Sequence, residues 1–408
     1  MNLQALGKAL KGDKVIWGIF IALCVVSLLE VFSASSTIVY RQQNHWAPIL
    51  RHAAFLLIGL GGVLFLQRIP TRFFSILVFG VPVSAILLVI AMSFGENVNG
   101  AQRWLGVGAF TIQPSEFAKI SLIGFLAFFL SRMNEKNESW IYKTMLVAIF
   151  GTCILIAPEN LSTACLLFAV SFLMMFIGQV SMKRLVKLVG AGIVGLVLLI
   201  SLAALIPDSF TKEYIPRLAT WKARIERHSD DDVKIGAPEF KITDENYQES
   251  HAKIAIANGG LIGFPGSGSE RDVLPQAYSD FIYAIILEEM GLFGGLFVLL
   301  LYIALMLRCG IIASKTDKKF PRYLILGAGL MITIQALANM AVAVGLIPVT
   351  GQPLPLISRG GTSTIITCAY FGIILACSAK INEDEHEEVD EDIANLEVGD
   401  FSKAEVES

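Results

Sequence analysis

Charged residues are scarce in this chain of 408 residues, and their scarcity argues against a soluble fold. Asp, Glu, Lys and Arg make up 16% of the sequence, whereas hydrophobic residues make up 54% and the mean hydropathy is +0.64. Several apolar runs reach the ~20 residues that a helix needs to cross a bilayer. The composition therefore predicts an integral membrane protein with several spans.

Paired cysteines and a basic face are also missing. The six cysteines include no CxxC pair, so the sequence indicates neither a metal site nor a disulfide framework. The net charge is −3, and the lysines and arginines lie between apolar runs, which argues against nucleic acid as a partner. Residues 1–14 show no cleavable-signal pattern, so we expect the first apolar run to be a span.

The apolar runs predict an all-α polytopic integral membrane protein with about ten transmembrane helices. Its membrane domain is expected over residues 15–380, after an N-terminal segment of residues 1–14. A large loop, residues 207–278, is expected between spans seven and eight, and a re-entrant segment between spans nine and ten. The predicted spans are roughly 15–34, 52–68, 73–95, 114–131, 143–158, 161–179, 187–206, 281–307, 323–346 and 363–380.

The basic residues are shared unevenly between the two faces. With the N-terminus inside, the short outside loops carry only Arg41, Arg51, Arg103 and Arg359. By the positive-inside rule both termini are then cytoplasmic, and the large loop faces outside. The inside segments carry Lys8, Lys11, Lys14, Arg68, Arg72, Arg132, Lys136, Lys143, Lys183, Arg184, Lys187, Arg308, Lys315, Lys318, Lys319 and Arg322.

The C-terminal tail, residues 381–408, is acidic and is predicted to be disordered. Two interpretations are open for it. The tail either binds a cytoplasmic partner or is a solvated segment without a role.

One acidic residue stands where a long apolar helix is expected to begin. Asp280 lies at the outer end of the predicted span 281–307, where an ionisable residue is a functional candidate. The alternative is that Ser279 or Asp280 caps the helix. Glu288 and Glu289 are expected about 12 Å deeper along the same helix. At that depth each carboxyl group must be paired, be protonated or lie in a cavity. Lys119 or a helix N-terminus is a candidate partner for one of them. Two roles are open: a polar contact that holds the structure together, or a step in a proton path.

Two other outer segments carry charged residues. At the end of residues 96–119, Glu116 and Lys119 lie three apart and therefore on one helical face. They either form a self-satisfied ion pair or point into a polar cavity. Glu159 is a carboxylate at the same face, in the turn between spans five and six, and a plain turn explains it equally well.

The large loop offers further candidates. Residues 211–228 predict an interfacial amphipathic helix with its basic side toward lipid headgroups. The alternative is that Arg217 or Arg224 contacts a phosphate of a lipid-linked substrate. A short helix is expected over residues 247–257 and includes Gln248, a candidate substrate contact. The glycine-rich stretch around Ser267 suits a loop whose N–H groups approach an anion.

Prolines and glycines break the apolar run between the last two spans. Non-helical backbone at membrane depth is tolerated only where protein buries it or where it lines a wet cavity. Residues 345–364 are therefore predicted to form the re-entrant segment, with Ser358 and Arg359 near its tip. Arg359 is a candidate contact for an anionic group.

Together these segments resemble the RodA/FtsW family, the polytopic glycosyltransferases of bacterial shape, elongation, division and sporulation. The resemblance covers the chain apart from its acidic tail. The matching stretches are NGAQRWLGVGAFTIQPSEFAKI, APENLST, YQESHAKIAIANGGLIGFPGSGS, LPQAYSDFIYAIILEEMG and GLIPVTGQPLPLISRGGTS.

The resemblance implies that the chain polymerises lipid II, a disaccharide-pentapeptide on undecaprenyl pyrophosphate, at the outer face of the cytoplasmic membrane. It also implies a class B penicillin-binding transpeptidase as a partner, with other membrane proteins of division or elongation. The Ser-Arg-Gly-Gly-Thr-Ser loop looks more like the FtsW branch.

The resemblance assigns residues as well. The family's essential carboxylate, in a His-Thr-Asp-Phe motif, falls on Asp280, although Tyr-Ser replaces the usual His-Thr. The family's Pro-Ser-Glu-Phe-x-Lys element places catalytic candidates at Glu116 and Lys119. Its Gln-Pro-Asp-Leu-Gly-Thr turn is altered, with Glu159 in place of the Asp and one residue added.

The implied reaction makes a β-glycosidic bond from an α-linked pyrophosphate donor, which inverts the anomeric carbon and needs a base for the acceptor hydroxyl. Asp280 is a candidate for that base, or for holding a divalent cation, Mg²⁺ or Mn²⁺, near the pyrophosphate. The leaving group needs charge stabilisation. The cations of the outer face are Lys119, Arg103, Arg217 and Arg359.

The chief rival interpretation is a lipid II flippase, because many spans and a broken segment also suit a transporter. A flippase needs polar groups along a path through the bilayer, whereas here they gather at the outer face, which favours an enzyme. A third interpretation, a scaffold that only recruits a partner, leaves Asp280, Glu116 and Lys119 unexplained.

Overall fold

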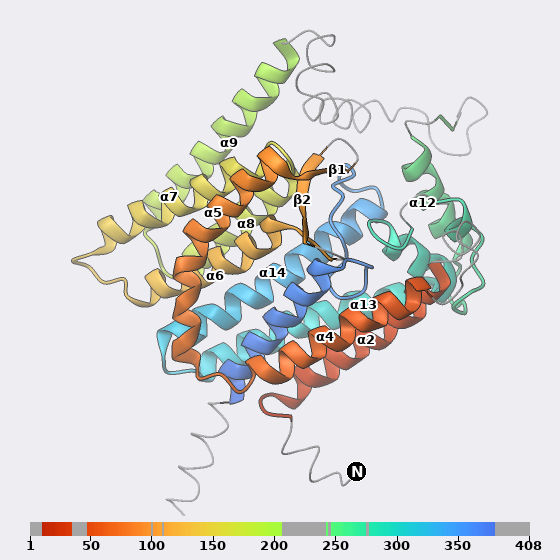
Figure 1. The fold of residues 1–408 in the computed structure, drawn as a ribbon, viewed down its shortest axis with the longest axis horizontal. Helices are drawn as coiled ribbons and strands as arrows, with labels where there is room; N and C mark the ends of the chain where they lie inside the picture. Colours follow the sequence, from red (N-terminus) through yellow and green to blue (C-terminus); the bar gives the residue numbers. More distant parts are fainter. Residues whose placement is uncertain are drawn as a thin grey trace, which may run out of the picture.

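The computed structural model describes residues 10–34, 47–98, 101–107, 110–205, 242–243, 246–274 and 277–379. Long helices dominate it (Figure 1). They are α2 (Lys14–Ala34), α4 (Ala47–Leu66), α5 (Leu77–Phe94), α6 (Pro114–Ser131), α7 (Glu138–Ile156), α8 (Leu161–Ile177), α9 (Met182–Leu205), α12 (Tyr247–Asn258), α13 (Ile282–Lys315) and α14 (Lys319–Ala343). The C-terminal helix, Thr362–Ala379, and two short 3₁₀ helices, η1 (Thr71–Ile76) and η2 (Glu270–Asp272), complete the set.

The prediction of a polytopic helical membrane protein is confirmed. In the described part of the chain, eight helices are long and apolar enough to cross a membrane, and α8 is equally apolar but shorter. Helix α4 begins at Ala47 rather than 52, and α7 at Glu138 rather than 143. Hydropathy alone missed these first turns because charged residues such as Arg51 and Glu138 lie in them.

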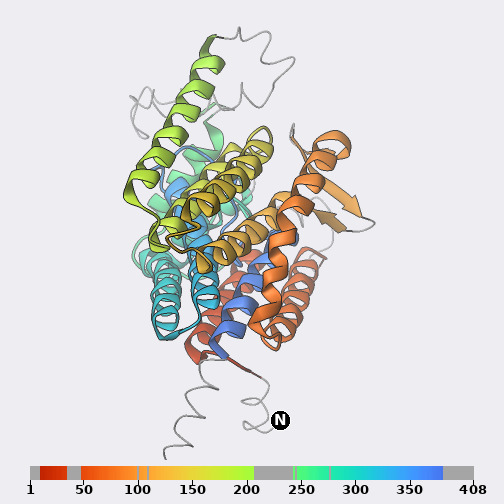
Figure 2. The same ribbon diagram turned by 90° about the vertical axis from the view of Figure 1, so that its left-hand side faces the viewer.

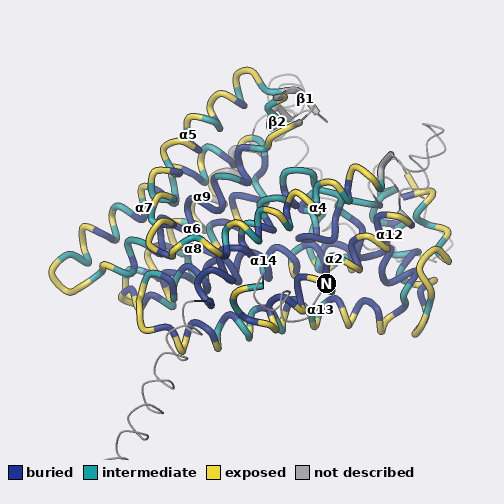
Figure 3. The backbone as a smooth tube through the Cα atoms, turned by 60° about the horizontal axis from the view of Figure 1, so that its bottom comes forward, coloured by how far each residue is buried: buried dark blue, intermediate teal, exposed yellow. Residues whose placement is uncertain are grey.

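Burial divides the helices into a centre and a periphery. Helices α6, α14 and the C-terminal helix are mostly buried, whereas only 22% of the span windows of α4 and α5 is buried. Figure 3 shows α6 and α14 largely dark blue and much of α5 yellow. The exposed side chains of α5 are large and apolar, for example Phe79, which is 70% exposed. Such a belt of apolar side chains is stable against lipid rather than water.

The predicted loop at residues 96–112 is instead a small antiparallel sheet, which is the one departure from the all-α prediction in the described residues. It has the order β1-β2-β3, from Glu96–Val98, Ala101–Val107 and Phe110–Ile112. Strands β1 and β3 are only three residues long, and the longer β2 (AQRWLGV) lacks the apolar alternation that identifies a strand in a sequence. The sheet packs on α5 and α6, and it lies on the opposite side of the bundle from α9 (Figure 2).

Helix α13 is broken at Gly291, where a single span was predicted. Gly291 has φ 69° and ψ −172°, a conformation that is essentially restricted to glycine. The N–H groups of Leu292 and Phe293 donate to the carbonyls of Gly260 and Leu261 in the large loop, at 3.1 and 3.2 Å. The loop therefore supplies the hydrogen bonds that the break removes from the helix.

The glycine-rich stretch of the large loop binds two carboxylates of its own chain. The backbone N–H groups of Ser269 and Glu270 donate to Glu288 at 2.9 and 3.1 Å, and that of Gly266 donates to Glu289 at 2.7 Å. Arg271 forms an ion pair with Glu289 at 3.2 Å. Of the two partners predicted for these glutamates, Lys119 is wrong, because it pairs with Glu116 instead. The helix N-terminus is found, because Ser269 and Glu270 are the N-cap and first residue of η2.

The predicted re-entrant segment between α14 and the C-terminal helix is non-helical, and residues 352–358 within it are buried apart from Pro353. Side chains of the surrounding helices satisfy its backbone carbonyls. Gln335 and Asn339 of α14 donate to Pro353 and Gln352. The remaining donors come from two other helices: Tyr302 of α13 bonds the carbonyl of Pro355, and Ser27 of α2 bonds that of Ile357.

The two ends of the described chain lie at the same end of the bundle (Figure 1). The backbone N–H of Asp13 donates to the Ser378 hydroxyl at 3.0 Å, which joins the start of α2 to the end of the C-terminal helix. Burial alone would raise the pKa of Asp13, but hydrogen bonds from Arg308 and from the backbone of Ile16 lower it overall. The tail, residues 381–408, lies outside the described residues.

Replacement of Gly291 by alanine tests the break. A Cβ at Gly291 would lie 2.6 Å from the backbone of Leu261, and its φ is unfavourable for any other residue. We expect Gly291→Ala to lower the free energy of unfolding by about 3 kcal/mol or more, measured as thermal unfolding in detergent. Gly310, in the same helix, has open space around it, so Gly310→Ala should be neutral or stabilise by up to about 1 kcal/mol. Equal melting temperatures for the two variants would contradict this account.

Candidate active site

A cavity of about 280 Å³ lies at the end of the bundle opposite the chain termini. The N-terminal turns of five helices surround it: α4, α6, α8, α13 and the C-terminal helix. Helix N-termini carry partial positive charge, so this end of the bundle favours anions. The lining residues from the helices, the sheet and the re-entrant segment are Arg51, His52, Phe55, Trp104, Thr111, Gln113, Glu116, Asn160, Thr163, Tyr278, Ser279, Asp280, Gly351, Gln352, Pro353, Arg359, Gly360, Gly361 and Ser363.

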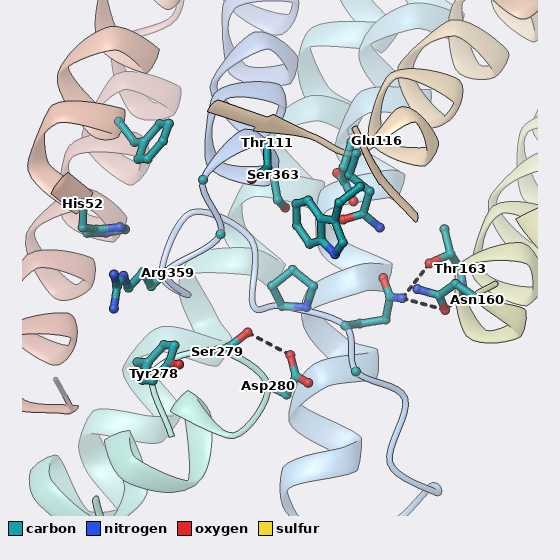
Figure 4. Close-up of a pocket in the computed structure, with 18 of the residues that line it drawn as sticks. His52, Thr111, Glu116, Asn160, Thr163, Tyr278, Ser279, Asp280, Arg359 and Ser363 are labelled. Atoms are coloured by element: carbon teal, nitrogen blue, oxygen red, sulfur yellow. Dashed lines mark hydrogen bonds between the residues drawn. The ribbon is translucent and has the colours of Figure 1, made fainter. Parts of the chain in front are cut away.

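Asp280 lines this cavity and is only half buried (Figure 4). The Ser279 hydroxyl donates to its Oδ1 at 2.9 Å. The alternative of a helix cap does not hold, because Phe281 occupies the N-cap position and no side chain caps the helix. The carboxylate therefore faces the cavity rather than the backbone of α13.

Backbone hydrogen bonds fix the segment that carries Asp280. Asn339 of α14 donates to the carbonyl of Asp280 at 2.8 Å, and the hydroxyl of Ser358 donates to that of Ser279 at 2.6 Å. The N–H of Arg359 donates to the carbonyl of Tyr278 at 3.0 Å. Three successive carbonyls before α13 are thus bound by α14 and the re-entrant segment, which sets the direction of the Asp280 side chain.

Glycine at position 351 keeps the approach to Asp280 open. Gly351 has φ +66°, and a Cβ there would lie 3.5 Å from Asp280 Oδ2. A longer side chain on this backbone would extend toward the carboxylate. The re-entrant segment therefore leaves space beside the acid where a substrate group can enter.

Glu116 faces the cavity from the first turn of α6, and Lys119 lies behind it. Their side chains form an ion pair at 2.7 Å, and Lys119, which is 1% exposed, also donates to Gln335 at 2.9 Å. Lys119 does not line the cavity. The ion-pair interpretation and the cavity interpretation thus both hold in part. Glu116 and Lys119 neutralise each other, and the Glu116 carboxylate borders the cavity on the side opposite Asp280 (Figure 4).

The turn before α8 contributes Asn160 and Thr163 rather than Glu159. Asn160 caps α8 by accepting from the N–H of Thr163 at 3.1 Å, and both residues line the cavity. Gln352 of the re-entrant segment donates to Thr163 at 2.7 Å. Glu159 borders a small neighbouring cavity between α5 and α7. In the sequence, the position of Asn160 three residues before Thr163 suits an N-cap and could have indicated that these two residues start α8 at the cavity.

His52 is a lining residue that the sequence analysis missed. Ser27 uses its only hydroxyl proton to bond the carbonyl of Ile357, so it accepts from His52 Nε2 at 2.7 Å. The Nδ1 atom is then an acceptor, and it has no hydrogen-bond partner in the described part of the chain. Figure 4 places His52 and Arg359 on the same side of the cavity. A single histidine within an apolar run gave no sequence signal for this.

Two cations, Arg51 and Arg359, are among the described residues that line the cavity. Arg359 lies over the ring of Tyr278, with 5.3 Å between the guanidinium carbon and the ring centroid, and Arg51 lies 6.0 Å from the ring centroid of Phe55. The structure thus places Arg359, the predicted contact for an anionic group, in the lining of the cavity. Ser358, by contrast, is 2% exposed and holds the backbone of the segment instead of lining the cavity.

The other predicted site residues are not brought together here. Gln248 lies in the first turn of α12 and Ser267 is exposed, its hydroxyl bonded to the Phe264 carbonyl; neither lines the cavity. The backbone of Arg103 lies in β2, but its side chain is outside the described set, and Arg217 is outside the described residues altogether. Within the described ranges no cluster of three or more His, Cys, Asp or Glu could hold a metal ion.

A match between a protein-family model and the whole membrane domain of this chain shows its family. A family model of cell cycle proteins, covering FtsW, RodA and SpoVE, matches residues 13–383. The chain belongs to the FtsW/RodA/SpoVE family. This membership agrees with the resemblance that the motifs carried.

Two FtsW relatives illustrate the likeness. A probable peptidoglycan glycosyltransferase FtsW of Enterococcus hirae is 30% identical over 394 residues, which cover 93% of this chain and 95% of the relative. One of Tolumonas auensis is 32% identical over 338 residues, with 80% and 81% covered.

Solved structures of FtsW/RodA-type chains share the fold. The rod shape determining protein RodA of Thermus thermophilus superposes with a TM-score of 0.61 at 24% identity, over 90% of this chain and 96% of that one. A chain from a study of the structural coordination of polymerization and crosslinking by a peptidoglycan synthase complex gives 0.68 at 23% identity, over 91% and 98%.

A double-mutant cycle tests the ion pair behind the cavity. Glu116→Gln leaves the charge of Lys119 buried beside Gln335, so we expect a loss of about 3–5 kcal/mol in the free energy of unfolding. The double variant Glu116→Gln/Lys119→Met should recover much of that loss, because no charge is left unpaired. The half-exposed pair of Lys253 and Glu249 supplies the control, and Lys253→Met should change stability by about 0.5 kcal/mol or less. Strictly additive losses would contradict a coupled pair.

Proposed function

We propose that this chain is a peptidoglycan glycosyltransferase that polymerises lipid II, the activity after which its FtsW relatives are named. The observation that carries the proposal is the half-buried Asp280 carboxylate in a cavity flanked by arginines and helix N-termini. A carboxylate beside an anion-binding surface suits a reaction in which a hydroxyl attacks a sugar pyrophosphate.

In the proposed reaction, Asp280 takes the proton of an acceptor hydroxyl as its oxygen attacks the anomeric carbon. The new C–O bond forms as the bond to the pyrophosphate breaks, in one displacement that inverts the anomeric centre. The electron pair of the broken bond goes to the undecaprenyl pyrophosphate. The only proton that Asp280 must handle is the one that the acceptor loses.

The leaving pyrophosphate gains charge, and the cavity has positive groups to meet it. Arg359 and Arg51 line one side, and the first turns of the surrounding helices add partial positive charge. The Nδ1 atom of His52 adds a hydrogen-bond acceptor on that side, suited to a sugar hydroxyl or amide. Glu116, held by Lys119, contributes a fixed acceptor on the opposite side.

A divalent cation is compatible with the cavity in one arrangement. Mg²⁺ commonly binds one or two carboxylates together with substrate phosphates, so Asp280 would hold it through a single protein ligand. When bound, Mg²⁺ or Mn²⁺ would neutralise charge on the pyrophosphate. Asp280 then positions the metal, and the acceptor needs another base.

The apolar runs predict ten spans, and the positive-inside rule supports both termini in the cytoplasm and the cavity at the outer face of the cytoplasmic membrane. On that face the lipid-linked precursor and a class B penicillin-binding transpeptidase would both be accessible. The FtsW names of the relatives support a role in division.

Polymerisation of labelled lipid II tests the role of Asp280. We expect Asp280→Asn, in the presence of the cognate transpeptidase blocked by a β-lactam, to lower the rate of chain formation by about 100-fold or more. Asp272→Asn is the control, because Asp272 is an exposed carboxylate of the same loop; it should polymerise like the wild type.

Equal chain lengths from a folded Asp280→Asn protein would contradict the assignment. An inactive wild type would favour the flippase or scaffold interpretation, and translocation of lipid II in vesicles would separate those two. Addition of EDTA with Mg²⁺ rescue would distinguish the metal-holding role of Asp280 from the role of a base alone.

Arg359 should act on binding of the pyrophosphate. We expect Arg359→Gln to raise KM for lipid II by about tenfold, the effect of losing one charged hydrogen bond, whereas Arg359→Lys should retain part of the affinity. Initial rates against lipid II concentration measure this. Unchanged KM and unchanged kcat in a folded Arg359→Gln protein would contradict a contact between Arg359 and the pyrophosphate.

A further inference from the structure

A second and larger cavity, of about 750 Å³, lies at the end of the bundle where the chain termini lie. It is formed by the turn from α4 to η1, the end of α6, the turn from α13 to α14, and the last turn of the C-terminal helix. The site of the proposed reaction is at the other end of these helices and uses none of this surface.

All the charged side chains among the described residues that line this cavity, called the basic cavity, are positive. Its charged residues are Lys11, Arg68, Arg72, Arg132 and Lys318, and all five are exposed. No acidic side chain is among the described residues that line it. Arginine residues in it lie on aromatic rings: Arg132 is 3.5 Å from the ring centroid of Phe128, and Arg72 is 5.0 Å from that of Phe73.

Within the described part of the chain, no ion pair links Arg68, Arg72 or Arg132 to a carboxylate. Five like charges around one hollow repel one another, so the cavity stabilises a polyanion more than any single charge. The ligand that fits is therefore acidic and extended.

Such a polyanion begins in the sequence directly after the cavity wall. Ala379, the last described residue, lines the cavity, and eight of the ten residues 383–392 are Asp or Glu. Glu383 is four residues beyond Ala379, so an extended chain brings it within about 13 Å of that wall. A short tether of this kind gives an effective concentration in the millimolar range.

We propose that the acidic segment 383–392 binds in the basic cavity of its own chain. Bound there, it connects the α4–η1 turn, the end of α6 and the α13–α14 turn at the cytoplasmic face. The charge of the segment exceeds that of a single lipid headgroup, and its tether places it at the site, which favours the tail over anionic lipid as the occupant. A partner that binds the tail would have to remove it from this cavity.

Zero-length crosslinking of the full-length protein tests the proposal. A carbodiimide joins a carboxylate to a lysine amine as an amide only where the two are in contact. In nanodiscs of zwitterionic phosphatidylcholine, we expect mass spectrometry to find amides between residues 383–392 and Lys11 or Lys318. Lys183 and Lys187 of α9 are exposed lysines outside the cavity, and they should give few links.

Paired variants make the test specific. Arg68→Gln/Arg72→Gln should lower the yield of links to Lys11 and Lys318 about tenfold, because two charge contacts of the segment are lost. Lys183→Gln/Lys187→Gln removes the same amount of charge outside the cavity and should leave the yield unchanged. Rising salt should lower the yield in the wild type.

Three outcomes overturn the proposal. Equal linking to Lys183, Lys187, Lys11 and Lys318 means that the tail is solvated without a site. Links to Lys11 and Lys318 that survive Arg68→Gln/Arg72→Gln mean that proximity alone produces them. Loss of the links when phosphatidylglycerol is added means that lipid headgroups occupy the cavity in an anionic membrane, whereas their retention supports the tail as the occupant.

Discussion

The buried, non-helical backbone between α14 and the C-terminal helix is the constraint on which the site depends. Peptide groups that leave a helix inside a membrane bundle must find partners within the protein. Gln335, Asn339, Tyr302 and Ser27 supply them from three helices. Because Asn339 also bonds the carbonyl of Asp280, the same side chain that satisfies the re-entrant segment fixes the acid beside it. The same set of hydrogen bonds therefore stabilises the re-entrant segment and positions the Asp280 carboxylate.

Charged or polar partners explain why Glu116, Glu288 and Glu289 are tolerated near this site. Glu116 forms an ion pair with Lys119, Glu289 forms one with Arg271, and Glu288 accepts hydrogen bonds from N–H groups of the large loop. These carboxylates are held in place by the protein, whereas Asp280 borders a cavity open to substrate. Of these four acids, Glu116, Glu288 and Glu289 therefore join structural elements, and Asp280 is the one suited to chemistry.

Hydropathy and charge predicted the helices, the re-entrant segment and the place of Asp280, because these follow from local composition. The break in α13 was missed since Gly291 looks like any helical glycine until Leu261 packs against it. The partners of Glu288 and Glu289 come from a loop about twenty residues away, and the Ser27 that bonds His52 lies on another helix. Such pairings depend on packing between distant segments, which one sequence does not specify.

The most direct test of the central claim is a cryo-EM structure of the Asp280→Asn variant in nanodiscs with lipid II. The account predicts pyrophosphate density in the cavity beside Arg359, with a sugar hydroxyl or anomeric carbon next to residue 280. Ordered substrate elsewhere, for example in the basic cavity at the opposite face or along a path through the helices, would contradict an active site centred on Asp280.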